Sequence, residues 1–296
     1  MGTYVFVYGT LRKYESNHGY IQNSTCKANQ AWVKGILYDT GDGYPALTVD
    51  DNSGLVYGEV YEVDAVTLEK IDDLEDYKAD RDENLYMRIE TNIYTDQGVL
   101  KGFTYVAGNQ SRLRNKIDLG DWRVYQFLKE RPASVFYFAY GSCMDQERFE
   151  LARADSYFQK EVGAGVLQGY SMKYTFRVED GGRADIVEAN DRLEGILYDC
   201  PQDAVPYLFK REGVYTQSYR PTFVDIQVGY QVYPSCLTFT VVHKNEEMAP
   251  PVHYAKEILR GSKGKVSSSY YERLIRQLED LEFDLAHQEI DSIIQS

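Results

Sequence analysis

Short apolar runs separated by Gly, Asn and Asp recur along the whole chain and predict β-strands joined by turns. In the first half the runs are TYVFVYG, VKGILYD, LVYGEVYEV, YMRIETNIYT and VLKGFTYVAG. In the second half they are VFYFAYG, GYSMKYTF, LEGILYD, RPTFVDIQVG and SCLTFTVV. Helical spacing of apolar residues indicates helices at about 64–76, 202–212 and 269–295. The pattern predicts a small mixed α+β fold in each half, with a closed or nearly closed sheet.

The helix expected at 269–295 is the longest of the three. It opens with the letters SYYE at 269–272, which has capping-box spacing. Its apolar stripe is formed by Leu274, Leu278, Leu281 and Leu285. Because one apolar stripe is typical of a helix that covers a core, we expect this helix to cap its own domain rather than to form an interface.

The two halves of the chain repeat each other, which predicts a tandem duplication. YVFVYGTLR at 4–12 is matched by FYFAYGSCM at 136–144. The offset is 132 from Tyr8 to Tyr140, 134 from Gly35 to Gly169 and 137 from Gly58 to Gly195. It rises and never reverses, as expected when loops change length after a duplication. The polar stretch KERPAS at 129–134 marks the boundary, so we place domain 1 at 1–131 and domain 2 at 135–296.

Composition and charge narrow the classes of function. With 296 residues, 43% of them hydrophobic and 14% aromatic, the chain can build two cores. Its net charge of −14 disfavours binding to nucleic acids or to anionic membranes, because both need a basic surface. We see no signal peptide and no apolar run of membrane-spanning length, and therefore expect a cytoplasmic protein. The oligomeric state stays open.

No motif for a metal or a cofactor is present in the sequence. The cysteines Cys26, Cys143, Cys200 and Cys236 form no C-x-x-C pair, and the four histidines form no H-E-x-x-H motif. No glycine-rich dinucleotide loop follows any of the predicted strands. We therefore expect neither a metal nor a cofactor.

The first candidate for chemistry is the loop that ends the opening strand of each copy. These loops are Tyr8-Gly9-Thr10-Leu11 and Tyr140-Gly141-Ser142-Cys143. A Gly directly after a strand allows a sharp turn, and successive N–H groups in such a turn form a nest that can hold a carboxylate or an oxyanion. The alternative is an ordinary strand end with a structural glycine turn.

The second candidate is an acidic residue at the end of a helix in each copy. Leu68, Ile71 and Glu75 share one helical face, and Val205, Leu208 and Glu212 repeat the same spacing. Each Glu stands 17 positions after its repeat glycine, Gly58 or Gly195. A carboxylate that continues an apolar stripe should be partly desolvated, which raises its pKa toward that of a useful general base. The alternative is a helix-end Glu that reaches into water.

A nest beside a desolvated carboxylate fits acid–base chemistry on a small anionic compound. Cys143 could instead act as a nucleophile, but its counterpart in the first copy is Leu11.

The motifs also resemble a known family. In domain 1 they are YGTLR at 8–12, GYPAL at 43–47, GEVYEVD at 58–64 and LE at 74–75. These resemble the γ-glutamylamine cyclotransferase (avirulence-induced-gene-like) branch of the γ-glutamylcyclotransferase superfamily. Domain 2 resembles the γ-glutamylcyclotransferase branch proper, through YFAYGSCM, LEGILYD, REGV, APPVHYAKEILRGSKGK and SYYERL.

The resemblance implies a small barrel with flanking helices in each domain and an activity without a cofactor. Glu75 and Glu212 would correspond to the catalytic acid/base, the YGTL and YGSC loops to the substrate loop, and Tyr254 to a substrate-contacting tyrosine. The implied reaction is attack of the α-amine of a γ-glutamyl compound on its own γ-carbonyl, which releases 5-oxoproline and an amine or amino acid. Such an enzyme acts as a lyase or acyltransferase on a small-molecule γ-glutamyl substrate.

Two departures from the family pattern leave the substrate and the number of active copies open. Domain 1 has Asp76 after Glu75 where the family usually has Gly, and domain 2 has Cys143 where the family often has Asn. Two other functions also remain open at this stage. One is a pair of metabolite-binding domains without turnover, and the other is removal of a γ-glutamyl group from a specialised amine.

Overall fold

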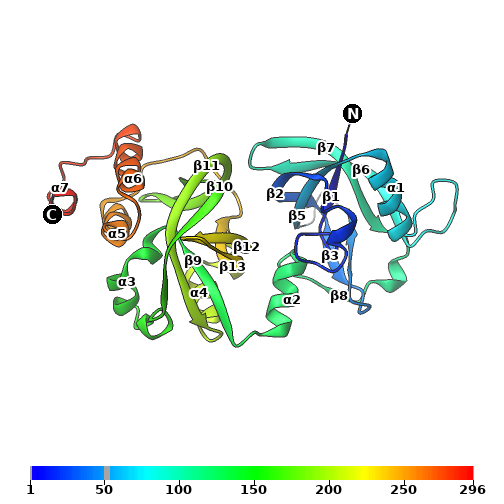
Figure 1. Ribbon diagram of the computed structural model, residues 1–296, viewed down its shortest axis with the longest axis horizontal. Helices are drawn as coiled ribbons and strands as arrows, with labels where there is room; N and C mark the ends of the chain where they lie inside the picture. The colour runs from blue at the N-terminus through cyan, green and yellow to red at the C-terminus, as the bar shows by residue number, and fades with distance from the viewer. Residues whose placement is uncertain (1, 50–53, 296) are drawn as a thin grey trace. The chain divides into compact units, whose positions relative to one another are not determined.

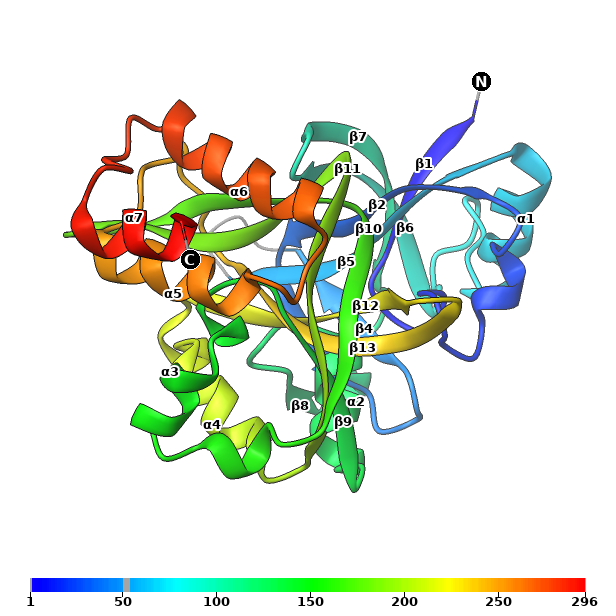
Figure 2. The same ribbon diagram turned by 60° about the vertical axis from the view of Figure 1, so that its left-hand side comes forward.

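The structure is a computed structural model that describes residues 2–49 and 54–295. The chain divides into two compact units, Met1–Glu130 and Arg131–Ser296. Each unit contains a closed five-stranded barrel with flanking helices (Figures 1 and 2). The predicted fold class, a tandem pair of small α+β barrels, is therefore confirmed.

The first unit builds its barrel in the strand order β1-β5-β2-β6-β7. These strands are β1 (Thr3–Val7), β2 (Thr25–Lys34), β5 (Leu55–Val63), β6 (Tyr86–Thr95) and β7 (Gly98–Ala107). A second sheet, in the order β4-β3-β8, consists of β3 (Ile36–Asp39), β4 (Pro45–Thr48) and β8 (Asn115–Lys116). The helices are α1 (Ala65–Leu74) and α2 (Trp122–Glu130), with 3₁₀ turns η1 (His18–Tyr20) and η2 (Gln110–Arg112).

The second unit builds its barrel in the strand order β10-β11-β9-β13-β12. These strands are β9 (Ser134–Ala139), β10 (Glu161–Val178), β11 (Gly181–Pro201), β12 (Tyr219–Val228) and β13 (Gln231–Val241). The helices are α3 (Gln146–Leu151), α4 (Ala204–Arg211), α5 (Val252–Ser262), α6 (Ser268–Asp280) and α7 (Gln288–Gln295). The 3₁₀ turns are η3 (Ser142–Met144), η4 (Asp155–Tyr157) and η5 (Val214–Thr216). Helices α5, α6 and α7 follow β13 and gather on one side of this unit (Figure 2).

The two barrels have the same topology, which supports the predicted duplication. Each opening strand pairs in parallel with the last barrel strand of its copy: β1 with β7 at Val5 and Phe103, and β9 with β13 at Tyr137 and Leu237. All other barrel pairings are antiparallel. The closed order around the barrel is also the same when β1, β2, β5, β6 and β7 are matched to β9, β10, β11, β12 and β13.

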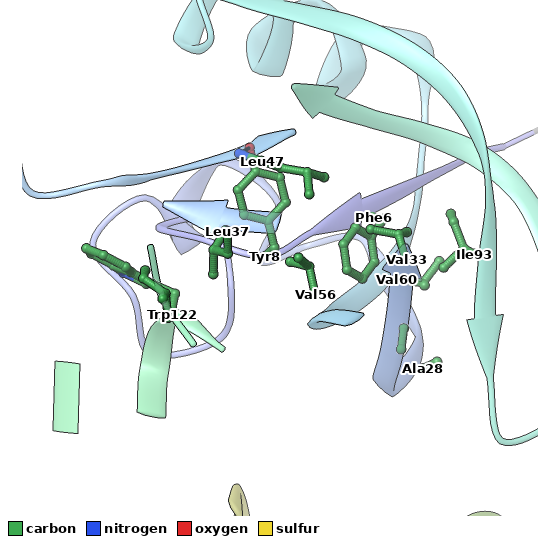
Figure 3. Packing of buried hydrophobic residues seen from close by; sticks show 12 residues of the cluster. Phe6, Tyr8, Ala28, Val33, Leu37, Leu47, Val56, Val60, Ile93 and Trp122 are labelled. Atoms are coloured by element: carbon green, nitrogen blue, oxygen red, sulfur yellow. Dashed lines mark hydrogen bonds between the residues drawn. The ribbon is translucent and has the colours of Figure 1, made fainter. Parts of the chain in front are cut away.

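Side chains along β1 and the residue after it point alternately into two apolar clusters. Phe6 and Tyr8 face a cluster with Leu47 and Val56, which Figure 3 shows from close by. Val5 and Val7 face a second cluster that also contains Leu11 and Ile71. The Tyr8 hydroxyl donates to the Tyr105 carbonyl at 2.7 Å and accepts from the Leu47 amide at 3.3 Å. Both faces of the strand are therefore fixed where the YGTL loop begins.

The predicted C-terminal helix is wrong in its extent. The segment 269–295 forms two helices, α6 and α7, with a turn after Asp280. The N-cap is Ser267 rather than Ser269, because the Ser267 hydroxyl accepts the Tyr270 amide at 3.2 Å. Leu274 and Leu278 are buried in α6, whereas Leu281 and Leu285 lie beyond its last residue and are half-buried. The apolar stripe therefore continues past the point where the helix ends.

One strand prediction also needs correction. VKGILYD is not one strand, since β2 ends at Lys34 and β3 begins at Ile36. A Cβ on Gly35, between them, would lie 2.5 Å from the Thr48 carbonyl oxygen, so the close approach of β4 requires glycine. Helices α2, α3 and α5 were not predicted. No helix in the described part of the chain is long and apolar enough to cross a membrane.

Candidate active sites

The first unit contains a cavity of about 240 Å³ where β1 ends. Its walls come from the loop after β1, the end of α1, the start of β4 and strands β6 and β7. The lining residues are Phe6, Val7, Tyr8, Gly9, Thr10, Leu11, Asn17, Tyr44, Pro45, Leu74, Glu75, Leu85, Tyr86 and Tyr105. Glu75 is the one member of this described lining with a charged side chain. The cavity thus brings together all the site residues predicted for domain 1.

The loop after β1 presents backbone amides to this cavity. Within residues 2–49 and 54–295, the amides of Gly9, Thr10 and Leu11 donate to no protein acceptor. The turn is closed behind them by the Arg12 amide, which donates to the Gly9 carbonyl at 3.0 Å. A Cβ on Gly9 would lie 2.7 Å from Pro45 Cγ, so a side chain at this position would collide with the opposite wall. Three consecutive unpaired amides beside a cavity are suited to holding an anion.

The side chains of the same loop fix its shape. The Thr10 hydroxyl accepts from Asn17 Nδ2 at 3.0 Å, and the Asn17 amide donates to the Thr10 carbonyl at 2.9 Å. Leu11 is buried in the core, so it contributes its amide rather than a polar side chain to the cavity.

Arg12 anchors the loop from behind through a buried ionic cluster. Its Nε lies 3.2 Å from Glu59 Oε1 and its Nη1 lies 2.8 Å from Asp121 Oδ1. All three side chains are at least 96% shielded from solvent. The Tyr61 hydroxyl and the Lys13 amide donate to the second oxygen of Glu59. A loop movement that pulled Arg12 out of this cluster would leave the buried charges of Glu59 and Asp121 uncompensated. The cluster therefore holds the loop in a single conformation.

Glu75 is the C-cap residue of α1, and its amide donates to the Ile71 carbonyl at 2.9 Å. Ile71, four residues earlier on the same face, is fully buried. Burial raises the pKa of Glu75 to about 7, and desolvation is the cause. The helix ends because Asp76 adopts a left-handed conformation with φ 52°, which Asp tolerates better than most residues.

The second unit has the same elements around a much smaller cavity, of about 30 Å³. Its lining residues are Tyr137, Tyr140, Gly141, Ser142, Cys143, Ala184, Glu212, Tyr219, Phe239 and Tyr254. As in the first unit, the amides of Gly141, Ser142 and Cys143 donate to no protein acceptor in the described segments, and the Met144 amide closes the turn on the Gly141 carbonyl at 3.0 Å. Thus the site residues predicted for domain 2 also lie together.

Glu212 repeats the position of Glu75 but has different neighbours. It is the C-cap residue of α4, followed by Gly213 in a left-handed conformation. Its Oε1 accepts from Cys143 Sγ at 3.7 Å and lies 3.6 Å from Arg211 Nε. Burial raises the pKa of Glu212, an effect that the Arg211 guanidinium and the Cys143 hydrogen bond partly oppose. Burial also raises the pKa of the Cys143 thiol, which disfavours the thiolate that a nucleophile needs.

Tyr254 reaches the second cavity from α5. Its hydroxyl oxygen accepts the Ala184 amide at 3.2 Å. The position of Ala184 in its copy corresponds to that of Pro45 in the first, because each carbonyl accepts a tyrosine hydroxyl, from Tyr219 and Tyr86 respectively. Pro45 has no amide to donate, so this contact is specific to domain 2.

Comparisons with known proteins agree with this geometry. Residues 5–124 match a family described as gamma-glutamyl cyclotransferase, AIG2-like, and residues 192–274 match the AIG2-like family. The protein YkqA of Bacillus subtilis is 40% identical over 282 residues, which cover 95% of this chain and 99% of that protein. The chain belongs to the AIG2-like γ-glutamylcyclotransferase family. The resemblance that the motifs indicated is thereby confirmed.

Other members of the family are similar over part of the chain. The gamma-L-glutamyl-butirosin B gamma-glutamyl cyclotransferase of Niallia circulans is 42% identical over 123 residues, which cover 41% of this chain and 76% of that enzyme. The gamma-glutamylcyclotransferase of Bos taurus is 25% identical over 169 residues, 54% of this chain and 88% of that enzyme. The crystal structure of YkqA matches with a TM-score of 0.86 at 41% identity, over 95% of this chain and 99% of that chain.

Sequence reasoning missed several residues that shape these cyclotransferase-family cavities. Tyr86 and Tyr219 open equivalent strands, β6 and β12, and line their respective cavities. The two tyrosines are 133 positions apart, within the range of the repeat offsets. This spacing could have identified them as equivalent residues from the sequence. Arg211 opens the REGV motif, but its contacts with Glu212 and with the loop after β9 depend on the fold and could not be predicted from the motif. No group of three metal-binding side chains that could hold an ion occurs in the described segments.

Proposed function

We propose that the cavity of domain 1 catalyses the intramolecular cyclisation of a γ-glutamyl compound to 5-oxoproline, with Glu75 as the proton carrier. The observation that supports this most directly is the joint lining of one cavity by three unpaired amides, of Gly9, Thr10 and Leu11, and by a carboxyl whose pKa is raised to about 7. A group with this pKa can both accept and return a proton near neutral pH.

The charges of a γ-glutamyl group suit this arrangement. Its α-carboxylate needs hydrogen-bond donors, and the amides of residues 9–11 are the unpaired donors of the first loop. Its α-amine needs an acceptor, and Glu75 is the charged member of the described lining. In this binding mode the α-amine lies beside Glu75, and the backbone amides hold the α-carboxylate.

The chemical step balances without a co-reactant. The α-nitrogen, in its uncharged amine form, attacks the γ-carbonyl carbon, one of its two protons passes to the Glu75 carboxylate, and the new C–N bond closes a five-membered lactam. The tetrahedral intermediate then collapses, the bond to the leaving nitrogen breaks, and Glu75 returns the proton to that nitrogen. Because both reacting groups belong to one molecule, holding them in register can lower the barrier by up to about 7–11 kcal/mol.

The lining of the cavity favours a leaving group without a carboxylate. Apart from Glu75 the described lining is uncharged, and it is rich in aromatic residues such as Tyr44, Tyr86 and Tyr105. The nearby Arg112 is engaged elsewhere, since its Nη1 lies 3.9 Å from Asp42 Oδ2 and donates to the Tyr44 hydroxyl. The carboxylate on the leaving amino acid of a γ-glutamyl dipeptide would therefore lose water beside Glu75, and the described lining has no free cation to compensate its charge.

The test measures release of 5-oxoproline by the full-length protein from two matched compounds, γ-glutamyl-n-butylamine and γ-glutamyl-L-alanine. We expect 5-oxoproline from the amine, with a kcat/KM at least about tenfold above that for the dipeptide, equivalent to about 1.4 kcal/mol of discrimination. A preference for the dipeptide would contradict the leaving-group assignment while leaving the cyclisation intact.

The same assay separates this proposal from a metabolite-binding role. If the protein binds either compound, seen as a rise in the thermal unfolding temperature followed by Trp fluorescence, yet releases no 5-oxoproline from them or from a wider panel of γ-glutamyl amines, the cyclisation is excluded. The name of the Niallia circulans relative makes γ-L-glutamyl-butirosin B a sensible member of that panel.

A further inference from the structure

The residue before the acidic side chain differs in kind between the two copies. In domain 1 this residue is Leu74, and in domain 2 it is Arg211. The offset of 137 is the same as that between Glu75 and Glu212, so the two positions are equivalent. Leu74 contributes to the lining of a cavity of about 240 Å³, whereas the equivalent cavity beside Arg211 has about 30 Å³.

The Arg211 side chain contacts Glu212 and two side chains of the loop after β9. Its Nε donates to Cys143 Sγ at 3.1 Å and lies 3.6 Å from Glu212 Oε1. Its Nη2 donates to Ser142 Oγ at 3.2 Å. One guanidinium thus connects the acidic residue to the loop that carries the unpaired amides, and the side chains of Arg211 and Glu212 are only 15% and 17% exposed.

A γ-glutamyl group does not fit the second cavity in this arrangement. A volume of about 30 Å³ is enough for about two water molecules, whereas a γ-glutamyl group has nine non-hydrogen atoms before the leaving group is counted. The substrate's α-ammonium would also compete with the guanidinium for the same carboxylate. Binding of the α-ammonium at Glu212 therefore requires that the contact between Arg211 and Glu212 be broken.

We propose that Arg211 is the residue that closes the second site, so that the full-length protein turns over γ-glutamyl substrates in domain 1. This inference rests on the proposed function and adds to it which copy works and why. In domain 1 the equivalent Leu74 has no charge to offer to Glu75 or to the loop, so that cavity stays open. Arg211 acts through its hold on Glu212 and on the Ser142–Cys143 segment and is a positioning residue.

The test exchanges the two residues in the full-length chain. Glu75→Gln removes the base of domain 1 and should lower 5-oxoproline release from γ-glutamyl-n-butylamine by at least about 1,000-fold. Adding Arg211→Leu, which introduces the residue of domain 1, should raise the activity of that variant at least about tenfold. Adding Glu212→Gln as a third change should abolish the gain, which places the recovered activity in the second cavity.

The reciprocal change is the matched control. Leu74→Arg in the otherwise natural chain should lower kcat/KM at least about tenfold, mainly through a higher KM, because the new guanidinium competes for Glu75. Far-UV circular dichroism checks that each variant is folded. If Arg211→Leu unfolds domain 2, Arg211→Gln removes the guanidinium with a polar side chain in its place, and the same gain is expected.

Failures of the two proposals are distinguishable. Absence of 5-oxoproline from the natural chain would refute the proposed function. If the natural chain and Glu75→Gln are both active and adding Glu212→Gln removes the activity of Glu75→Gln, the second site is already open; if Glu75→Gln/Glu212→Gln is still active, the assignment of the two acidic residues as proton carriers is wrong. If Glu75→Gln/Arg211→Leu, or Glu75→Gln/Arg211→Gln in its place, is folded but shows no gain over Glu75→Gln, Arg211 does not close the site.

Discussion

Glu75 occupies a position where the requirements of stability and of chemistry oppose each other. It ends α1 on the same face as Ile71, which is fully buried, and it faces a largely aromatic cavity. Desolvation favours the neutral acid in the folded state, whereas an unfolded chain exposes the side chain to water. The proposed proton carrier would therefore work near neutral pH at the expense of folding free energy.

This opposition predicts that Glu75→Gln stabilises domain 1, with an effect that depends on pH. The folded pKa of about 7 lies above the unfolded value, so the natural chain loses stability as the pH rises from the unfolded toward the folded pKa. The stability gain of the variant should grow by about 2 kcal/mol between about pH 5.5 and about pH 8.5. Urea unfolding followed by Trp fluorescence measures it, since Trp32 and Trp122 both belong to the first unit.

Asp73→Asn is the control for that measurement. Asp73 lies on the same helix, and its side chain is 68% exposed in its ion pair with Lys78. We expect a small difference from the natural chain, one that does not increase across this pH range as that of Glu75→Gln does. A Glu75→Gln gain equal at both pH values would mean that Glu75 is not held with a raised pKa.

Among single residues, those that recur in both copies could be predicted from the sequence. The YG turns and the two acidic residues recur at matching positions, so one copy supports the interpretation of the other. Arg211 and Leu74 differ between the copies, and the comparison of repeats does not show which of two unlike residues matters. Contacts to Glu212, Cys143 and Ser142 give Arg211 its importance, and these come from the packing of α4 against the loop after β9.

Among the elements, the opening strand and the strand beside it approach closely at one glycine in each copy. A Cβ on Gly58 would lie 2.2 Å from the Val7 carbonyl oxygen, and one on Gly195 would lie 2.2 Å from the Ala139 carbonyl oxygen. Both would also meet a Phe ring, Phe6 or Phe138. Close backbone approach therefore requires glycine at these positions, next to the strands that lead into the YGTL and YGSC loops.

Gly58→Ala should accordingly destabilise domain 1 by about 2–3 kcal/mol, because neither the carbonyl nor the ring can move without disturbing the barrel. Urea unfolding followed by Trp fluorescence gives the measurement. Gly19→Ala is the matched control, since a Cβ there meets nothing within 4 Å, and we expect no loss of stability. Equal effects of the two substitutions would contradict the close approach of β1 and β5.

Element boundaries were predicted less well than element types. The strands that form the barrels follow from clustered β-branched and aromatic residues, and those clusters are present in the sequence. The break between α6 and α7 was missed because Leu281 and Leu285 continue the helical spacing of Leu274 and Leu278. The chain leaves the helix although its apolar pattern does not change, and periodicity alone cannot detect such a break.

At the scale of the whole molecule, duplication preserved the framework and changed the cavities. Both barrels keep the same strand order, the parallel closing pair and a tyrosine hydroxyl bonded to the last barrel strand, from Tyr8 to Tyr105 and from Tyr140 to Phe239. The framework was predictable because its residues recur. The cavities, of about 240 and 30 Å³, were not, because their volumes depend on side chains that differ between the copies.

In the proposed function, Glu75 carries the proton in a cyclisation performed by the first cavity. The most direct test compares release of 5-oxoproline from γ-glutamyl-n-butylamine by the natural chain, by Glu75→Gln and by Asp73→Asn, each checked for folding. We predict loss of at least about 1,000-fold in kcat for Glu75→Gln and an activity within about twofold of the natural chain for Asp73→Asn. A folded Glu75→Gln protein that releases 5-oxoproline as fast as the natural chain would contradict the account.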